Sequence, residues 1–214
     1  MKKYINTLIL GAILSFSSCV EHEVIPPPNP KVELDCSFTA VIDSQEVSFD
    51  SSGDGFVCES TQEKNILPAP QPSSVKYFST LRSTVNMTMI QLNYGRLLFQ
   101  PKDDSQTPTI DEFESFFLSE SKPDYSKNAH NGVEILYRTQ NGEVWRSIEN
   151  DSLGPQTFEF TSFNLETDPE AEYMKYTAIF SCYLYLFEPE DTDYEEPLDT
   201  MRLENGIYQN HVKR

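Results

Sequence analysis

The segment KYTAIFSCYLYLF, residues 175–187, predicts a strand at the centre of a β-sheet. Successive side chains of a strand point to opposite faces, and here both alternating sets are rich in apolar residues. One set is Ala178, Phe180, Cys182, Leu184 and Leu186, and the other is Ile179, Tyr183, Tyr185 and Phe187. A strand that is apolar on both faces is typical of one that is covered on both sides.

The sequence on either side of this segment predicts two hairpins and one more strand. Asn141-Gly142 lies between two strand-like runs, and Asn-Gly favours a two-residue turn because both residues tolerate positive φ. Such a turn places Arg138 opposite Trp145, the only tryptophan of the chain. Asn205-Gly206 predicts a final hairpin in the same way, with MRLE before it and IYQNHVK after it. QTFEFTSF, residues 156–163, alternates and predicts a strand.

The first half of the chain carries further strand signals. CSFTAVID and EVSFD, residues 36–43 and 46–50, predict a hairpin, and residues 56–58 predict a short third strand. Residues 60–74 contain three prolines and predict a long surface loop. Three further runs are rich in β-branched, aromatic and Met residues. They predict strands at 75–82, 85–94 and 96–100.

One helix interrupts these strands, in TIDEFESFFLS, residues 109–119. Thr109 and Glu112 have the spacing of a capping box, and Ile110, Phe113 and Phe117 share one face. We expect this helix to plug one end or edge of a sheet. Roughly ten short strands with one helix predict a mainly β fold for residues 36–214, an antiparallel β-sandwich or barrel-like domain.

The residues before this domain predict an export signal and a tether. Lys2 and Lys3 precede the apolar run Ile5–Phe16, which ends in Ser-Ser-Cys. This pattern predicts a signal peptide over residues 1–18, and the run is too short to cross a bilayer permanently. Residues 19–35 contain four prolines and predict a stiff proline-rich spacer.

Ser-Ser-Cys after such a run resembles the lipobox of bacterial lipoproteins, in the relaxed form common in Bacteroidetes. The resemblance implies that the chain is cut before Cys19, that Cys19 carries lipid, and that this lipid anchors the protein in the outer membrane. Glu21 and Glu23 weakly resemble the acidic export signal of surface lipoproteins, and a solvated linker is the alternative interpretation. The sequence therefore leaves open whether the domain faces the periplasm or the cell surface.

Charge and composition exclude two classes of protein. The chain has a formal net charge of −18, which repels nucleic acid, so we expect no nucleic-acid partner. Fourteen Phe and eleven Tyr are too many apolar rings for a disordered chain.

The cysteines predict one internal disulfide. With Cys19 assigned to lipid, Cys36, Cys58 and Cys182 are left, and three thiols allow one bridge at most. Cys36 and Cys58 flank a compact strand-turn-strand unit, so we expect them to pair and Cys182 to stay reduced and buried. The other two pairings remain open at this point.

Two acidic segments are candidate cation sites. Asp50, Ser52 and Asp54 match the opening of a calcium loop, but Thr61 occupies the position of its bidentate Glu, which favours a plain polar turn. Residues 188–197 hold six carboxylates, and such a charge run is more often a solvated loop than a cation site. The three histidines are isolated, and no nucleophile elbow or P-loop occurs. We therefore predict no metal, no cofactor and no catalytic residue.

One aromatic group is a candidate ligand platform. Trp145, with Tyr137 and Arg138 nearby, has the residue types of a sugar-stacking surface. Ordinary cross-strand packing, with Arg138 over the ring, is the alternative. The triplets around Ser152 and Thr200 also resemble the O-glycosylation motif of Bacteroidetes.

The patterns NGVEILYRTQNGEVWRS, YTAIFSCYLY and ENGIYQNHVK resemble small Bacteroidetes lipoprotein domains of unknown function, and CSFTAVIDSQEVSF resembles their first hairpin. The resemblance brings no activity with it. We expect a lipid-anchored, non-enzymatic envelope protein with a binding or structural domain, whose partner is a glycan or an envelope protein. The alternatives are a carbohydrate-binding accessory lipoprotein of a glycan-uptake system and a glycan hydrolase whose carboxylate pair the sequence does not single out.

Overall fold

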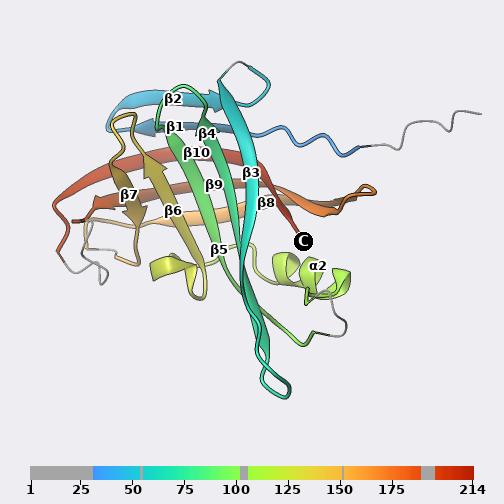
Figure 1. The fold of residues 1–214 in the computed structure, drawn as a ribbon. Coiled ribbons are helices and arrows are strands. Elements are labelled where there is room, and N and C mark those ends of the chain that lie inside the picture. The colour runs from blue at the N-terminus through green and yellow to red at the C-terminus, as the bar shows by residue number, and fades with distance from the viewer. Residues whose placement is uncertain (1–30, 54, 102–105, 151, 189–195) are drawn as a thin grey trace, which may run out of the picture. The chain divides into compact units, whose positions relative to one another are not determined.

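The computed structural model describes residues 31–53, 55–101, 106–150, 152–188 and 196–214, and residues 31–214 form one compact unit. Ten strands, one α-helix and one 3-10 helix make up this described part (Figure 1). The elements are β1 (Ser37–Ile42), β2 (Gln45–Asp50), β3 (Phe56–Asn65), β4 (Ser73–Ser83), β5 (Met89–Phe99), α2 (Ile110–Ser119), η1 (Lys127–Ala129), β6 (Val133–Arg138), β7 (Val144–Ser147), β8 (Thr157–Thr167), β9 (Glu172–Leu186) and β10 (Asp199–Lys213). None of the described helices is long and apolar enough to span a membrane.

All ten strands belong to one curled antiparallel sheet, so the predicted mainly β, barrel-like fold is confirmed (Figure 1). The strand order is β2-β1-β10-β9-β7-β6-β5-β4-β3, and β8 pairs with β9 beside this path. β9 is central, as its sequence predicts. It pairs with β10 along one edge and divides its other edge between β8 and β7.

The prediction that β9 is covered on both faces is wrong. The side chains from Tyr176 to Leu184 that point inwards are buried, but Ile179 on the opposite face is 41% exposed. That outer face is covered near both ends of the strand, where Tyr173 and Tyr185 are buried. Ile179, in the middle of the outer face of β9, therefore faces solvent.

The predicted hairpin at Asn205-Gly206 is also wrong, because β10 runs through these residues without reversing. Asn205 does adopt a positive φ of 52°, but it does so in a β-bulge between Leu203 and Gly206. A bulge absorbs one unusual backbone conformation and lets the strand continue. Gly206 then lies against the ring of Phe180, where a Cβ atom would be 2.9 Å from a ring carbon.

The β6–β7 hairpin forms as predicted but with a register shifted by one residue. Thr139 donates its N–H to the carbonyl of Glu143, so the loop has three residues, and only Gly142 has a positive φ. Tyr137 consequently lies opposite Trp145, and Arg138 lies opposite Val144 rather than Trp145. A shift of one residue moves each side chain to the opposite face.

Strand lengths in the first half also differ from the prediction. β3 continues to Asn65 and pairs with β4 along its whole length, so the surface loop shrinks to residues 66–72. β3 is polar because it is an edge strand, and such a strand resembles a loop in sequence. β5 is continuous from Met89 to Phe99, where two strands are expected, and residues 84–88 turn between β4 and β5.

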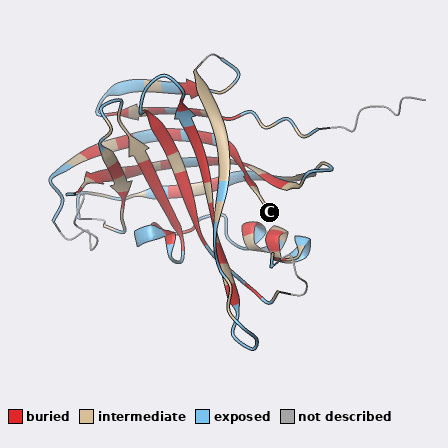
Figure 2. Cartoon of the chain, viewed as in Figure 1, coloured by how far each residue is buried: buried red, intermediate tan, exposed pale blue. Residues whose placement is uncertain are grey.

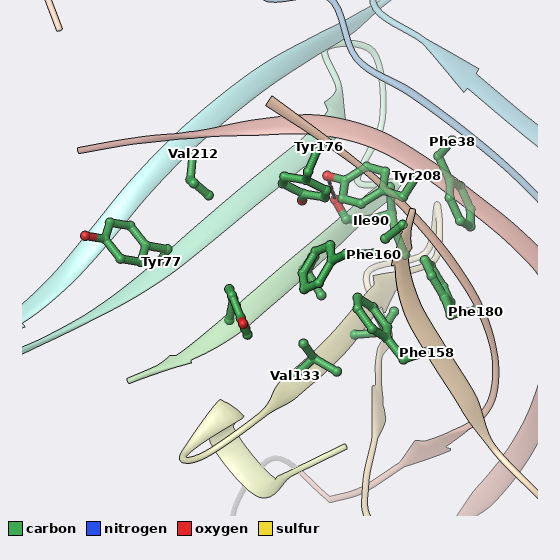
Figure 3. Packing of buried hydrophobic residues seen from close by; sticks show 14 of the residues in the cluster. Phe38, Tyr77, Ile90, Val133, Phe158, Phe160, Tyr176, Phe180, Tyr208 and Val212 are labelled. Carbon is green, nitrogen blue, oxygen red and sulfur yellow. Dashed lines mark hydrogen bonds between the residues drawn. The ribbon is translucent and has the colours of Figure 1, made fainter. Parts of the chain in front are cut away.

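Buried residues lie along the strands of the curl (Figure 2), and a close view shows aromatic rings packed on its inside (Figure 3). Phe38, Phe158 and Phe180 stack near β1, while Tyr208 from β10 donates its hydroxyl to the carbonyl of Ser79 in β4. The hydrogen bond of Tyr208 connects β10 with β4, which are far apart in the sheet order. Because side chains rather than a cavity occupy this space, the inside of the sheet is a core.

Helix α2 packs against one side of this core, as the sequence predicts. The capping box of Thr109 and Glu112 is present at its start. Phe113 and Phe117 are buried, and their rings contact Tyr77 from β4.

A disulfide and a few polar contacts fix the start of the domain. The structure joins Cys36, just before β1, to Cys58 in β3, with Cα atoms 6.1 Å apart, and leaves Cys182 as a buried thiol. Lys31 and Val32, which lie in the predicted tether, contact the β8–β9 turn. Lys31 pairs with Glu170 at 3.2 Å, and the N–H of Val32 donates to Asp168.

Candidate functional site

A pocket of about 780 Å³ lies over β8, β9 and β10, between two loops. We call it the outer groove. Its lining residues are 122–125 and 149–150 from the loops, and 156–159, 179–181 and 205–207 from and beside the three strands. Pockets of this volume are typical of ligand sites.

The floor of the outer groove is an exposed aliphatic pair. Ile179 of β9 and Ile207 of β10 are direct cross-strand partners, and they are 41% and 45% exposed. The bulge in β10 sets this pairing, and the N–H of Asn205 in the bulge donates to Ser181 Oγ at 3.1 Å. Two β-branched side chains thus stand together on the surface, at a place where the sheet has no second layer.

The first wall is the loop between β7 and β8, which is attached to the sheet by its own side chains. Gln156 Nε2 donates to the carbonyls of Ile148 and Asn150, at 2.9 and 3.0 Å. Gln156 Oε1 accepts the N–H of Tyr183, and the Tyr183 hydroxyl donates to the carbonyl of Leu153 at 2.8 Å. These bonds hold Glu149 and Asn150 beside the groove.

The second wall is the segment from Ser121 to Tyr125, which lies along the free edge of β8. The N–H of Phe160 donates to the carbonyl of Ser121 at 2.7 Å, and the Tyr125 hydroxyl donates to the carbonyl of Thr157 at 3.0 Å. Lys122 forms an ion pair with Glu159 of β8 at 3.2 Å. Both walls are therefore fixed to the strands that form the floor.

The outer groove carries unbalanced negative charge. Lys122 is neutralised by Glu159, whereas Asp124 and Glu149 are exposed and have no side-chain partner among the residues that the structure describes. Glu149 belongs to the first wall and Asp124 to the second. The groove therefore offers a ligand an aliphatic floor and two carboxylates. The residues described include no group of three or more His, Cys, Asp or Glu arranged to hold a metal ion.

A second polar constellation crosses β5, β6 and β7. Glu134 is 1% exposed, accepts from Asn93 Nδ2 at 2.6 Å, and pairs with Arg146 at 3.2 Å. Burial raises the pKa of Glu134 above its ordinary value, and Arg146 and Asn93 oppose that shift. Because a ligand cannot reach a carboxylate that is buried and paired in this way, the group ties neighbouring strands together. The outer groove is the better candidate site.

The predicted ligand platform is not an exposed surface. Trp145 is only 6% exposed and belongs to the core. The corrected register places Tyr137 opposite it on the inner face and turns Arg138 to the outer face. The ring of Trp145 therefore has packing partners rather than a free face for a sugar.

The candidate cation sites lie partly beyond the described residues. Asp50 accepts the N–H of Ser52 at 2.7 Å, as in an ordinary polar turn, and Asp54 is outside the described ranges. Residues 189–195 of the acidic loop, and Cys19 with the whole signal and proline-rich segment to residue 30, are also outside them.

Sequence reasoning missed the outer groove because its floor depends on register. Ile179 is expected under a second layer, and Ile207 is expected in a separate strand after a turn. The two meet only because the bulge at Asn205 lets β10 continue beside β9. A local pattern does not carry that information.

A scan against protein-family models and searches of curated proteins and of solved structures find no match to this chain.

Proposed function

We propose that this protein is a non-enzymatic binding protein of the bacterial cell envelope, anchored in the outer membrane through lipid on Cys19, and that it binds its ligand in the outer groove. The observation that carries the binding role is the exposed pair of Ile179 and Ile207 between two fixed walls. An apolar surface patch inside a concave, polar-rimmed site is typical of a ligand or partner surface.

The envelope location is supported by the signal run and by the lipobox resemblance of Ser-Ser-Cys. A lipid anchor followed by a proline spacer holds a domain away from a membrane surface, where it can meet a partner. Lys31 and Val32 contact the β8–β9 turn, and the prolines before them in the sequence, at 26–30, are the proposed spacer.

Binding to arrays of envelope glycans and of peptides tests the proposal, with the detergent-solubilised lipoprotein as the sample. Ile207→Glu places a charge on the groove floor without disturbing the core, because this side chain is 45% exposed. Leu198→Glu is the matched control, since Leu198 is 57% exposed and does not line the groove. We expect Ile207→Glu to lose the bound probes and Leu198→Glu to keep them.

Three results would contradict the proposal. The first is binding that persists in Ile207→Glu, and the second is an absence of binding to every probe class. The third is turnover of chromogenic glycosides by the purified protein, which would show the hydrolase alternative instead.

A further inference from the structure

We infer that the outer groove selects a cationic, amphipathic segment of a partner protein, one that presents Lys or Arg beside an aliphatic side chain. This inference rests on the proposed binding function and names its ligand class. Three properties of the outer groove support it separately: its negative charge, its aliphatic floor and its shape.

The charge of the groove favours a cation. Asp124 and Glu149 belong to the two different walls, and both are exposed without a side-chain partner in the described ranges. The one lysine in the lining, Lys122, is already paired with Glu159 at 3.2 Å. A Lys or Arg between the walls would interact with both carboxylates, whereas an acidic ligand would be repelled.

The floor favours an aliphatic side chain over a sugar. Sugars stack on exposed aromatic faces. The aromatic rings that line this groove, those of Tyr125, Phe158 and Phe180, are all buried and pack in the core. What is exposed is the branched aliphatic surface of Ile179 and Ile207.

The shape favours an extended peptide. The groove is bounded by two walls and has a volume of about 780 Å³, enough for several side chains. Neighbouring residues of an extended chain point in opposite directions, so a peptide can place an aliphatic residue on the floor while its neighbours reach the walls. A polyamine could pair with the carboxylates but would place no aliphatic side chain against Ile179 and Ile207.

Fluorescence anisotropy with labelled peptides tests this inference on the solubilised lipoprotein. The probe is a decapeptide with alternating Lys and Leu, and the comparison peptides carry Glu in place of Lys or Ser in place of Leu. The test variant is Asp124→Asn with Glu149→Gln. The matched control is Glu33→Gln with Glu46→Gln, which removes two exposed carboxylates outside the groove and changes the net charge equally.

We expect the Lys-Leu peptide to bind, with an affinity that falls as salt rises. The Asp124/Glu149 variant should weaken it at least ~10-fold, which corresponds to about 1.4 kcal/mol, and the control less than ~2-fold. The Glu-Leu and Lys-Ser peptides should bind much more weakly. Circular dichroism confirms that both variants keep the fold.

Equal losses in the test and control variants would overturn the inference, because they would mean general attraction to an acidic chain. Equal binding of the Glu-Leu peptide would overturn it as well. If a neutral peptide or a glycan binds, is lost in Ile207→Glu and is unaffected by the Asp124/Glu149 variant, the charge inference fails while the proposed binding function stands. If Ile207→Glu keeps all binding, both fail.

Discussion

Gly206 lies where neighbouring side chains leave no room for a Cβ atom. A Cβ atom at this position would lie 2.9 Å from Phe180 Cε2 and 3.0 Å from Leu203 Cδ2, both inside the core. Gly206→Ala should therefore lower the free energy of unfolding by roughly 1–3 kcal/mol, the usual cost of overpacking. Urea unfolding measures this difference.

Gly53→Ala is the control for Gly206→Ala. A Cβ at Gly53 meets only the carbonyl of Asp50 at 4.0 Å, an ordinary contact. We expect it to change the free energy of unfolding by less than ~0.5 kcal/mol. Equal stability of the two variants would show that the ring of Phe180 can move away.

The buried His211 should make the free energy of unfolding depend on pH. Burial, and secondarily the charge of Lys175, lowers the pKa of His211 from 6.5 to about 4. Between these values the unfolded chain takes up a proton that the folded protein does not, so acid favours unfolding. Relative to His211→Gln, the wild type should lose up to roughly 3 kcal/mol between pH 6.5 and pH 4, at ~1.36 kcal/mol per pH unit.

Unfolding in urea at a series of pH values measures this loss. Parallel curves for the wild type and His211→Gln would mean that the imidazole is protonated in the folded protein as easily as in the unfolded chain.

At the residue scale, the sequence predicted the pairing of two cysteines correctly but the exposure of individual side chains poorly. It named Cys36 and Cys58 as partners because they flank one compact unit, and the structure joins them. It selected Trp145 as a surface platform, and Trp145 is buried, because burial depends on which face a register gives it. Ile179 and Ile207 drew no attention because a single isoleucine carries no chemical signal.

At the scale of elements, helix α2 packs against the core through two aromatic side chains, Phe113 and Phe117. Phe117 is 1% exposed, and its ring contacts those of Tyr77, Tyr94 and Phe163. Phe117→Ala should cost about 3–5 kcal/mol of unfolding free energy, because it removes a buried ring and leaves a cavity. Thermal or urea unfolding measures it.

Leu118 provides the comparison for Phe117 from the same helix turn. It is 59% exposed, so Leu118→Ala should stay within ~0.5 kcal/mol of the wild type. A similar cost for both variants would mean that the substitutions act through helix formation rather than through the core.

The disulfide links β3 to the start of β1, and β3 pairs with a strand along only one edge. Replacing both Cys36 and Cys58 with Ser should cost ~3 kcal/mol in the chain-entropy account, given their separation of 22 residues. Urea unfolding checks the cost, and non-reducing peptide mapping checks the pairing.

Burial raises the pKa of Cys182 to about 12, so its thiol should resist alkylation until the protein unfolds.

Peptide mapping that finds Cys182 in a disulfide would contradict this arrangement. Rapid alkylation of Cys182 in the folded protein would contradict its burial.

The elements also show what a turn motif can and cannot predict. Asn-Gly favours a backbone with positive φ, and two of the three Asn-Gly pairs have it, at Gly142 and at Asn205, whereas Asn131-Gly132 does not. In one case the chain reverses with a three-residue loop, and in the other it bulges and continues. The local chemistry is the same, and the neighbouring strands decide between the two outcomes. The capped helix and the central strand were predictable because their patterns are long.

At the scale of the whole molecule, the proposed outer-membrane location depends on Cys19. The signal run that ends at this residue predicts that Cys19→Ala leaves an uncut precursor without lipid. Metabolic labelling with a fatty acid, followed by electrophoresis, measures both properties. Label retained on Cys19→Ala would rule out acylation at this cysteine.

The pairing of the first strand with the last also fixes when the protein can finish folding. Phe38 of β1 lies opposite Tyr208 of β10, about 170 positions later in the chain, so this contact is among the slowest kind to form. During synthesis or export from the N-terminus, the β1–β2 hairpin must wait with one edge unpaired until β10 arrives. A chain halted before β10 would leave the edge of β1 unpaired and its aromatic core exposed to proteases and to other chains.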